Sequence, residues 1–373
     1  MHLITRAIRK VLRTVAPDFL DRSDDRHLWR NLNRSPSDLE WQPLRRCPEK
    51  RLDAAAVQVG KKLFVFGGYY STEVVSVVDV LDLQDGVWWE TFPMPDTMAQ
   101  SHLAMATDGT RFVFAVSGQL GNQCHPATRN AFALDLETKA WSELPPLPAA
   151  RYAATMQWWN GRLHLVGGSR EDRHTPAHEH WSLGVTDGWA TEASWRVEIP
   201  IPRGGPHRAS AILAGKLYVF GGQEGDYVPI PGNPDYICTG DLVDERHHAE
   251  VHVLAPGARE WRRAADMPVA VSHTEFSTLQ QGNRLVVFGG QHEKDKATRL
   301  PVLTDAIQAY DADRDAWRIL GTLPYRVKTS VIGRHGDWLY SALGQRDRGP
   351  TDATSGEIVA HTWRAKIPAG WLD

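Results

Sequence analysis

A run of β-branched, aromatic and leucine residues that ends in a small residue and a glycine occurs six times in this chain. Examples are LFVFGG at 63–68, LYVFGG at 217–222 and LVVFGG at 285–290. Such runs predict β-strands. Successive repeats are 50, 50, 54, 68 and 54 residues apart, counted between the closing glycines Gly68, Gly118, Gly168, Gly222, Gly290 and Gly344. A period of this length predicts one supersecondary unit repeated about an axis.

Tryptophan follows most of these runs and precedes a proline-containing segment; the residues are Trp88 or Trp89, Trp141, Trp195, Trp261 and Trp317. A large aromatic side chain fills the wedge between neighbouring units, and paired glycines let the backbone turn where units crowd. This pattern resembles the kelch repeat of the galactose oxidase/kelch superfamily. The resemblance implies an all-β fold, a six-bladed kelch-type β-propeller whose blades have strands a to d from the axis outward.

The sixth repeat lacks a strand d of its own, because its strand candidates at 338–343 and 357–366 are followed only by the last few residues of the sequence. Trp41 lies ten residues before Arg51, the same offset as Trp141 before Arg151. We therefore expect the segment around Trp41 to complete the last blade, which would close the ring and leave no exposed edge. The predicted division is a helix and polar linker at 1–36 and the propeller at 37–373.

Apolar side chains recur at helical spacing in residues 1–16, with basic residues between them: Ile4, Ile8, Val11, Leu12 and Val15, and Arg6, Arg9, Lys10 and Arg13. This pattern predicts a short basic amphipathic helix, which either docks on the propeller or makes a peripheral membrane contact. A secretory signal would have an uninterrupted apolar run, which Arg6 and Arg9 break.

Composition restricts the partners and the location. The formal net charge of −3 predicts no nucleic-acid partner. Three widely separated cysteines, Cys47, Cys124 and Cys238, indicate free thiols in a reducing compartment, so we expect a cytoplasmic protein. No phosphate-binding loop or nucleophile-elbow motif occurs, and the sequence predicts no cofactor.

Antiparallel counting places the beginning of each strand a and the residues after each glycine pair on one central face. The first group contains Arg51, His102, Arg151, His207, Arg208, His273, Glu275, Arg326 and Lys328. The second contains Gln119, Gln223, Gln291, Gln345 and Arg346. An uncompensated cationic ring is costly, so it predicts a bound anion. Alternatively, these side chains bond neighbouring loop carbonyls and only hold the ring together.

If the pocket is catalytic, ring opening of an acidic sugar or similar polyhydroxylated anion needs a general acid and a general base. We assign proton transfer to Glu275 with His273 or His207, and carboxylate binding to Arg51, Arg151 and Arg326 with the other ring residues. A weaker hypothesis is a metal site formed by His102, His207 and His273 with Glu275. The longest insertion, residues 225–248, predicts an ordered lid over this face.

The overall plan is similar to that of bacterial sialic-acid mutarotases (N-acetylneuraminate epimerases), and segments such as 202–208, 323–329 and 344–350 look like those of plant kelch-repeat proteins. These resemblances imply two competing functions. One is a mutarotase- or epimerase-type enzyme, or a binding protein, for an anionic sugar. The other is a non-catalytic protein-interaction module that uses the same face, as many kelch domains are, and whose ligand is a protein partner.

Overall fold

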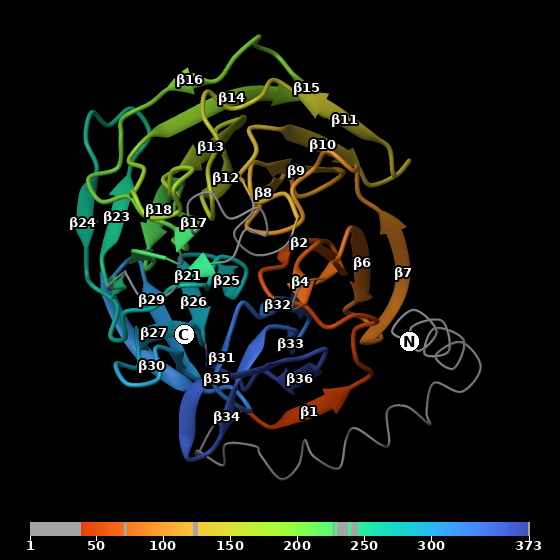
Figure 1. Ribbon diagram of the computed structural model, residues 1–373, viewed down its shortest axis with the longest axis vertical. Coiled ribbons are helices and arrows are strands. Elements are labelled where there is room, and N and C mark those ends of the chain that lie inside the picture. Colours follow the sequence, from red (N-terminus) through yellow and green to blue (C-terminus); the bar gives the residue numbers. More distant parts are fainter. Residues whose placement is uncertain are drawn as a thin grey trace.

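The computed structural model describes residues 39–70, 73–121, 126–226, 228–229, 238–239 and 245–371. Within these residues all the regular structure is β, and antiparallel sheets surround a common axis (Figure 1). This is the all-β architecture expected of a kelch propeller. We number the sheets in the sequence order of their inner strands. Within each sheet the strands are lettered from a at the axis to d at the rim. The a–b turn joins the first two strands, and the b–c connection joins the second and third.

The strands of each sheet follow the repeats of the sequence. Sheet one contains β2 (Ala55–Val59), β3 (Lys62–Phe66), β6 (Val77–Asp82) and β7 (Val87–Pro93). Sheet two contains β8 (Ala104–Thr107), β9 (Phe112–Val116), β10 (Ala131–Asp135) and β11 (Trp141–Leu144). Sheet three contains β12 (Thr155–Trp159), β13 (Arg162–Val166) and β14 (His180–Thr186), with β15 (Trp189–Ala190) and β16 (Arg196–Val197) both paired to β14.

Sheet four contains β17 (Ala209–Leu213), β18 (Lys216–Phe220), β23 (Val251–Leu254) and β24 (Arg262–Ala264). Sheet five contains β25 (Thr278–Gln281), β26 (Arg284–Phe288), β29 (Ala306–Asp311) and β30 (Ala316–Thr322). Sheet six contains β32 (Val331–His335), β33 (Trp338–Ala342), β36 (Thr362–Lys366) and β1 (Trp41–Leu44). Each inner strand contacts the inner strands of two others, in the order β2, β8, β12, β17, β25, β32 and back to β2.

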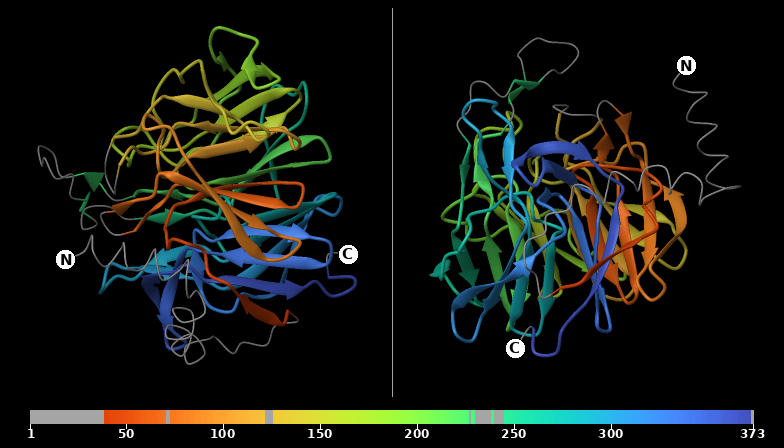
Figure 2. Two further views of the ribbon diagram at one scale, coloured as in Figure 1. Left: turned by 90° about the vertical axis from the view of Figure 1, so that its right-hand side faces the viewer. Right: turned by 90° about the horizontal axis from the view of Figure 1, so that it is seen from below.

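Shorter strands form the b–c connections on one side of the sheets. Three two-stranded sheets are present among the described residues: β4 (Tyr69–Tyr70) with β5 (Glu73–Val74), β19 (Gln223–Glu224) with β22 (Arg246–His247), and β20 (Val228–Pro229) with β21 (Cys238–Thr239). The connections of sheets five and six combine with β31 (Val327–Lys328), which precedes the inner strand of sheet six, into one five-stranded sheet. Its order is β27 (Gln291–Lys294), β28 (Pro301–Leu303), β35 (Asp352–Ile358), β34 (Gln345–Gly349) and β31. It projects beyond the inner strands on that side (Figure 2).

The core lies between neighbouring sheets. Between sheets two and three, for example, buried Phe114 and Leu144 pack with Met156, Trp181 and Trp195. The glycine pairs lie where neighbouring backbone leaves no space for a side chain. A Cβ on Gly118, whose φ is +100°, would lie 2.6 Å from the carbonyl oxygen of Ser101, so both the conformation and the close approach require glycine.

The tryptophans of the repeats tie the outer strand of one sheet to the end of the preceding outer strand. The indole N–H of Trp141 donates to the Pro93 oxygen at 3.4 Å, and that of Trp195 to the Pro145 oxygen at 2.8 Å. The same link joins Trp261 to Ile199, Trp317 to Ala265 and Trp41 to Thr322, at 3.0, 2.9 and 3.1 Å. In sheet one the buried residue is Trp88, whereas Trp89 is 55% exposed.

Strand β1 pairs antiparallel with β36, from Trp41 opposite Ala365 to Leu44 opposite Thr362. The two strands lie side by side although they come from opposite ends of the sequence (Figure 1). The expectation of one strand over 357–366 is wrong, because Glu357 and Ile358 belong to β35 in the b–c connection. After Ile358 the chain leaves the b–c connection and enters sheet six, where His361 directly precedes β36.

Several expectations concern residues outside the described part of the chain. The basic helix and linker at 1–36 lie there, as does most of the predicted lid at 225–248. No described helix is long and apolar enough to span a membrane. Cys47 is a buried free thiol, and burial raises its pKa to about 12.

Candidate functional site

One residue in each sheet occupies an equivalent position at the b–c end of the inner strand. This residue comes directly after one that pairs with the segment following the glycine pair. In sheet two, for example, Ser101 pairs with Gln119, and the next residue, His102, occupies the position. The set, which we call the axial ring, is Asp53, His102, Ala153, His207, His273 and Thr329, with φ between 44° and 60°. Residues other than glycine rarely adopt this left-handed conformation. Its occurrence in every sheet therefore indicates that packing at the axis enforces it.

The axial ring brings several predicted site residues together. The rings of His207 and His273 stack with their centroids 3.6 Å apart, and the His102 ring lies 5.4 Å from that of His207. Oε1 of Glu275 lies 2.8 Å from Nδ1 of His207, and the Asp53 carboxylate lies 3.5 Å from Nε2 of His102. The three residues assigned to proton transfer, Glu275, His207 and His273, thus belong to one buried cluster.

The histidines of this cluster titrate differently. Burial alone would lower the pKa of His207, but the charges of Glu275 and Asp226 outweigh it and raise the pKa to about 9. Burial lowers the pKa of His102 to about 4, against the attraction of Asp53. Burial and the charge of His207 hold the pKa of His273 well below its usual range. Near neutral pH the cluster therefore contains one imidazolium and two neutral rings.

The raised pKa of His207 makes folding stability depend on pH. Its pKa is about 9 in the folded protein and about 6.5 when unfolded, so its contribution is complete below about pH 6.5 and is lost as the pH rises through 9. We expect a loss of up to about 3 kcal/mol. Thermal melting from pH 6 to 10 should show this decline in the wild type, and His207→Gln should lack it. Parallel curves for the two proteins would contradict the assignment.

The arginines predicted to hold an anion point elsewhere. Arg51 pairs with Asp79 of strand c in its own sheet, and both side chains are fully buried. Arg151 lies 3.0 Å from Glu179 and covers the ring of Trp181. Each arginine lies two positions before the axial-ring residue of its own sheet, Arg51 before Asp53 and Arg151 before Ala153. Simple strand alternation would place them on the axis, but the left-handed residue turns the chain and directs them outward.

The other predicted residues are also engaged by the protein. Arg208 donates to the carbonyl oxygens of Arg203 and Glu250. Asp347 pairs with Arg326 at 3.1 Å and with Arg346 at 3.3 Å. The remaining contacts are Lys328 to Gln291 at 3.2 Å, Gln291 to Glu245 at 2.6 Å, Ser272 to Gln223 at 2.6 Å, and Gln345 to the Gly356 oxygen at 3.1 Å. Gln119 accepts from Arg173.

Sequence reasoning missed the partners of these cations. Buried Arg173 pairs with Asp226 at 3.1 Å and belongs to the b–c connection of sheet three. A signal was available for two of the acids, since Asp79 and Glu179 each follow their arginine by 28 residues, from 51 to 79 and from 151 to 179. The expectation of an uncompensated cationic ring is therefore wrong. The three arginines assigned to an anion, Arg51, Arg151 and Arg326, already have carboxylate partners.

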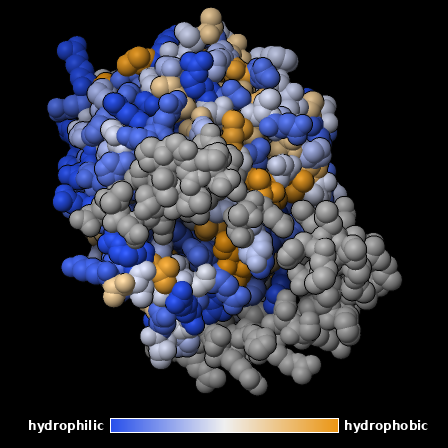
Figure 3. All heavy atoms as spheres, in the orientation of Figure 1, coloured by the Kyte–Doolittle hydropathy of each residue, from blue (hydrophilic) through white to orange (hydrophobic). Residues whose placement is uncertain are grey.

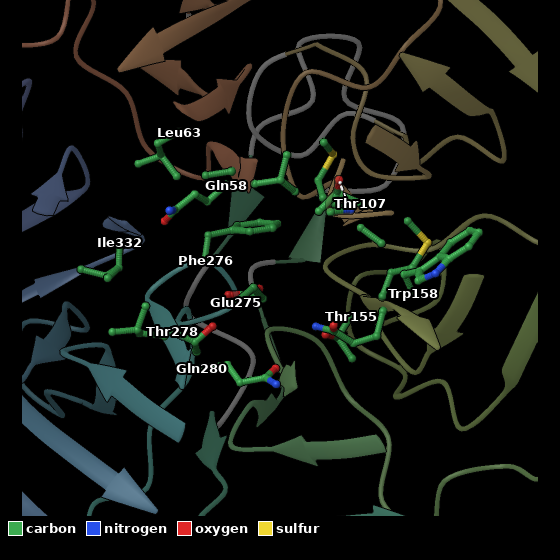
Figure 4. A pocket seen from close by; sticks show the side chains of 18 of the residues that line it. Gln58, Leu63, Thr107, Thr155, Trp158, Glu275, Phe276, Thr278, Gln280 and Ile332 are labelled. Carbon is green, nitrogen blue, oxygen red and sulfur yellow. Dashed lines mark hydrogen bonds between the residues drawn. The ribbon is translucent and has the colours of Figure 1, made fainter. Parts of the chain in front are cut away.

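A cavity of about 560 Å³ lies between the inner strands (Figure 4). Glu275, which pairs with His207, connects it to the histidine cluster. The cavity is lined by β2, β8, β12, β25 and β32 and reaches the a–b turns at Gly60 and Gly109. The cavity thus opens on the side opposite the b–c connections, where the sequence had not placed a pocket. Glu275 and Phe276 line its inner end.

The described residues contain no group of three His, Cys, Asp or Glu side chains arranged to hold a metal ion. The histidine candidates show the reason. The planes of His207 and His273 are 15° apart in a stack. Nitrogen lone pairs lie in the ring plane, so two stacked rings do not direct them at one ion.

Comparisons with known proteins give a consistent picture. A family model described as the Kelch motif matches residues 50–88. The chain is 43% identical over 331 residues to the Kelch repeat-containing protein At3g27220 of Arabidopsis thaliana, covering 88% of this chain and 76% of the relative. It is 26% identical over 298 residues to the Kelch-like protein terF of Aspergillus terreus, covering 75% and 58%. Over 192 residues it is 24% identical to the Kelch repeat and BTB domain-containing protein 12 of Danio rerio, covering 48% and 30%.

Proposed function

Because this chain belongs to the family of kelch repeat-containing proteins, we propose that it is a non-catalytic protein-interaction module that binds its partner on the b–c face. The observation that carries this proposal is the five-stranded sheet β27–β28–β35–β34–β31, which combines the connections of two neighbouring sheets. Loops on a rigid scaffold are common binding elements. Here the loops are themselves paired, so the surface is ordered before a partner arrives and less entropy is lost on binding.

Charge and burial in this sheet support a polar interface. Lys294 and Glu245 pair at 2.8 Å with both side chains buried, which fixes the base of β27. Glu293 and Arg348 are exposed on neighbouring hairpins of the same sheet. Seen from this side, hydrophilic side chains cover most of the described surface and apolar ones are scattered (Figure 3). Such a surface selects partners by complementary charge.

The ion pairs of Arg51 and Arg151 favour this function over an acidic-sugar enzyme. Binding a carboxylate through Arg51 or Arg151 would require its ion pair with Asp79 or Glu179 to break. For the fully buried Arg51–Asp79 pair, leaving one member without its partner costs about 3–5 kcal/mol. A contact with an anion would have to offset that loss. The ion pairs therefore favour a structural role for the central arginines.

The proposal includes the architecture, a closed six-bladed propeller in which β1 is the outer strand of the last blade. It is supported by the pairing of β1 with β36, by the cyclic contacts of the inner strands and by the Trp41–Thr322 link. Closure would protect the edge of sheet six. It would also hold the two halves of the sheet β27–β28–β35–β34–β31 in register.

Charge reversal on the b–c face tests the proposed function. We expect a partner captured with the wild type to be lost from the double variant Glu293→Arg with Arg348→Glu, because like charges would then face each other across the interface. Lys216→Glu is the matched control, since Lys216 is exposed on the a–b side. Quantitative mass spectrometry of the three purifications gives the result. A partner lost from the control but kept by the double variant would place the interface on the other face.

A further inference from the structure

The inner strand of sheet five contains two residues more than its counterparts. In sheet two, Ser101 opposes Gln119 and Ala104 opposes Val116, so both strands advance by three residues. In sheet five, Ser272 opposes Gln291 and Thr278 opposes Val287, so the inner strand advances by six and its partner by four. The extra residues form a turn closed by a 3.0 Å hydrogen bond from Ser277 N to Thr274 O.

This turn changes the inner end of the cavity described above. It directs Glu275 and Phe276 toward the axis, where the other inner strands continue as regular β-structure (Figure 4). Glu275 interacts with His207 through Oε1, at 2.8 Å. No described residue donates a hydrogen bond to its other oxygen, and the side chain lines the cavity. A carboxylate acceptor thus faces the cavity.

Two amides on the cavity wall also have unused hydrogen-bonding groups. Gln157 donates to the carbonyl oxygen and hydroxyl of Ser210, at 2.9 and 3.2 Å, and its own Oε1 receives no hydrogen bond from a described residue. Gln280, which is exposed at the open side of the cavity, accepts from the Ile212 N–H at 3.3 Å, and its amide donors have no described acceptor. The wall therefore offers a donor and an acceptor in addition to Glu275.

The charges around the cavity are balanced. Glu275 is compensated by the imidazolium of His207 at the inner end, and Asp108 and Arg334 carry opposite charges at the mouth. Apolar side chains also line the cavity, among them Leu63, Met105, Phe276 and Ile332, and Phe276 lies near the centre of the view in Figure 4. A volume of about 560 Å³ is within the usual range for small-molecule sites. A charged ligand would disturb this balance, whereas a neutral one would meet polar and apolar groups.

We propose that this cavity binds a small uncharged molecule that carries an amide or hydroxyl group next to a flat apolar part, with its polar donor on Glu275 and its apolar part against Phe276. The site lies on the a–b side of the histidine cluster and is separate from the proposed protein-binding face. Either proposal can fail without the other.

Matched probes test the charge and the position of this site. Benzamide, benzylamine and benzoate share one ring and differ in the charge of the head group. We expect benzamide to bind the wild type with a Kd on the order of millimolar, as fragments do, and at least about tenfold more tightly than benzylamine or benzoate. Ligand-observed NMR titration measures all three. Tighter binding of either charged probe, or no saturable binding of benzamide, would overturn the proposal.

Three variants locate the bound probe. Glu275→Gln should weaken benzamide binding about tenfold, because a neutral acceptor replaces the carboxylate. Thr278→Trp fills the cavity without touching the Glu275–His207 pair and should abolish binding. Glu293→Gln, on the b–c face, should leave it unchanged. Melting curves show which variants are folded. If benzamide binds folded Thr278→Trp as well as it binds the wild type, the site lies elsewhere and the proposal is wrong.

Discussion

Deletion of residues 1–44 is expected to destabilise the protein by about 3 kcal/mol or more, the range for removing a large packed side chain. The deletion removes β1, so the edge of β36 loses its pairing partner. It also removes the Trp41 link to Thr322 and buried Leu39, which packs with Leu323 and Tyr325. These losses act on one sheet and reinforce each other.

Deletion of residues 1–36 is the matched control. It keeps Leu39, β1 and all of their described contacts, so the protein should melt as the full chain does. Chemical denaturation of the three proteins, followed by tryptophan fluorescence, measures the difference in free energy of unfolding. Equal stabilities for the two truncated proteins would show that β1 does not close the ring.

Replacement of Arg51 by methionine is expected to destabilise the protein by about 3–5 kcal/mol, because it leaves Asp79 buried without its partner. Arg51 also donates to the oxygen of Gly67, in the glycine pair of the first repeat, at 3.1 Å. A residue that only held a ligand would behave differently, since its removal would affect binding and leave the unfolding free energy nearly unchanged. This variant therefore separates the structural role from the anion-binding role.

The double variant Arg51→Met with Asp79→Leu controls for the loss of packing. With both charges removed, no buried group lacks a partner, so the double variant should be more stable than Arg51→Met alone. Urea unfolding of the wild type, both single variants and the double variant gives the coupling energy of the pair. Additive single effects would show that Arg51 and Asp79 act independently and would refute the structural role assigned to the pair.

Much of the fold follows from local patterns that the sequence repeats. The strand before each glycine pair, the tryptophan at the rim and the position of Trp41 all depend on contacts within one repeat or between neighbours. The pairing of β1 with β36 could be anticipated because Trp41 precedes Arg51 as Trp141 precedes Arg151. The sequence also identified Glu275, His207 and His273, which the structure brings into one cluster.

Side-chain directions at the axis could not be predicted in the same way. Counting along an extended strand assumes alternation, and the left-handed residues of the axial ring interrupt it. Arg51 and Arg151 therefore turn outward to carboxylates that are distant in sequence. The insertion in sheet five is visible in the spacing of the sequence. Ser272 lies 19 residues before Gln291, whereas Leu52 and Tyr69 are only 17 apart.

Hydrogen–deuterium exchange of the protein with its purified partner tests the proposed binding face most directly. Backbone amides of the paired hairpins at 291–303 and 345–358 should exchange more slowly in the complex than in the free protein. The a–b turns at 60–62 and 214–216 should exchange equally in both states. Protection confined to the a–b turns, with none in the two hairpins, would contradict the assignment of the b–c face as the protein-binding surface.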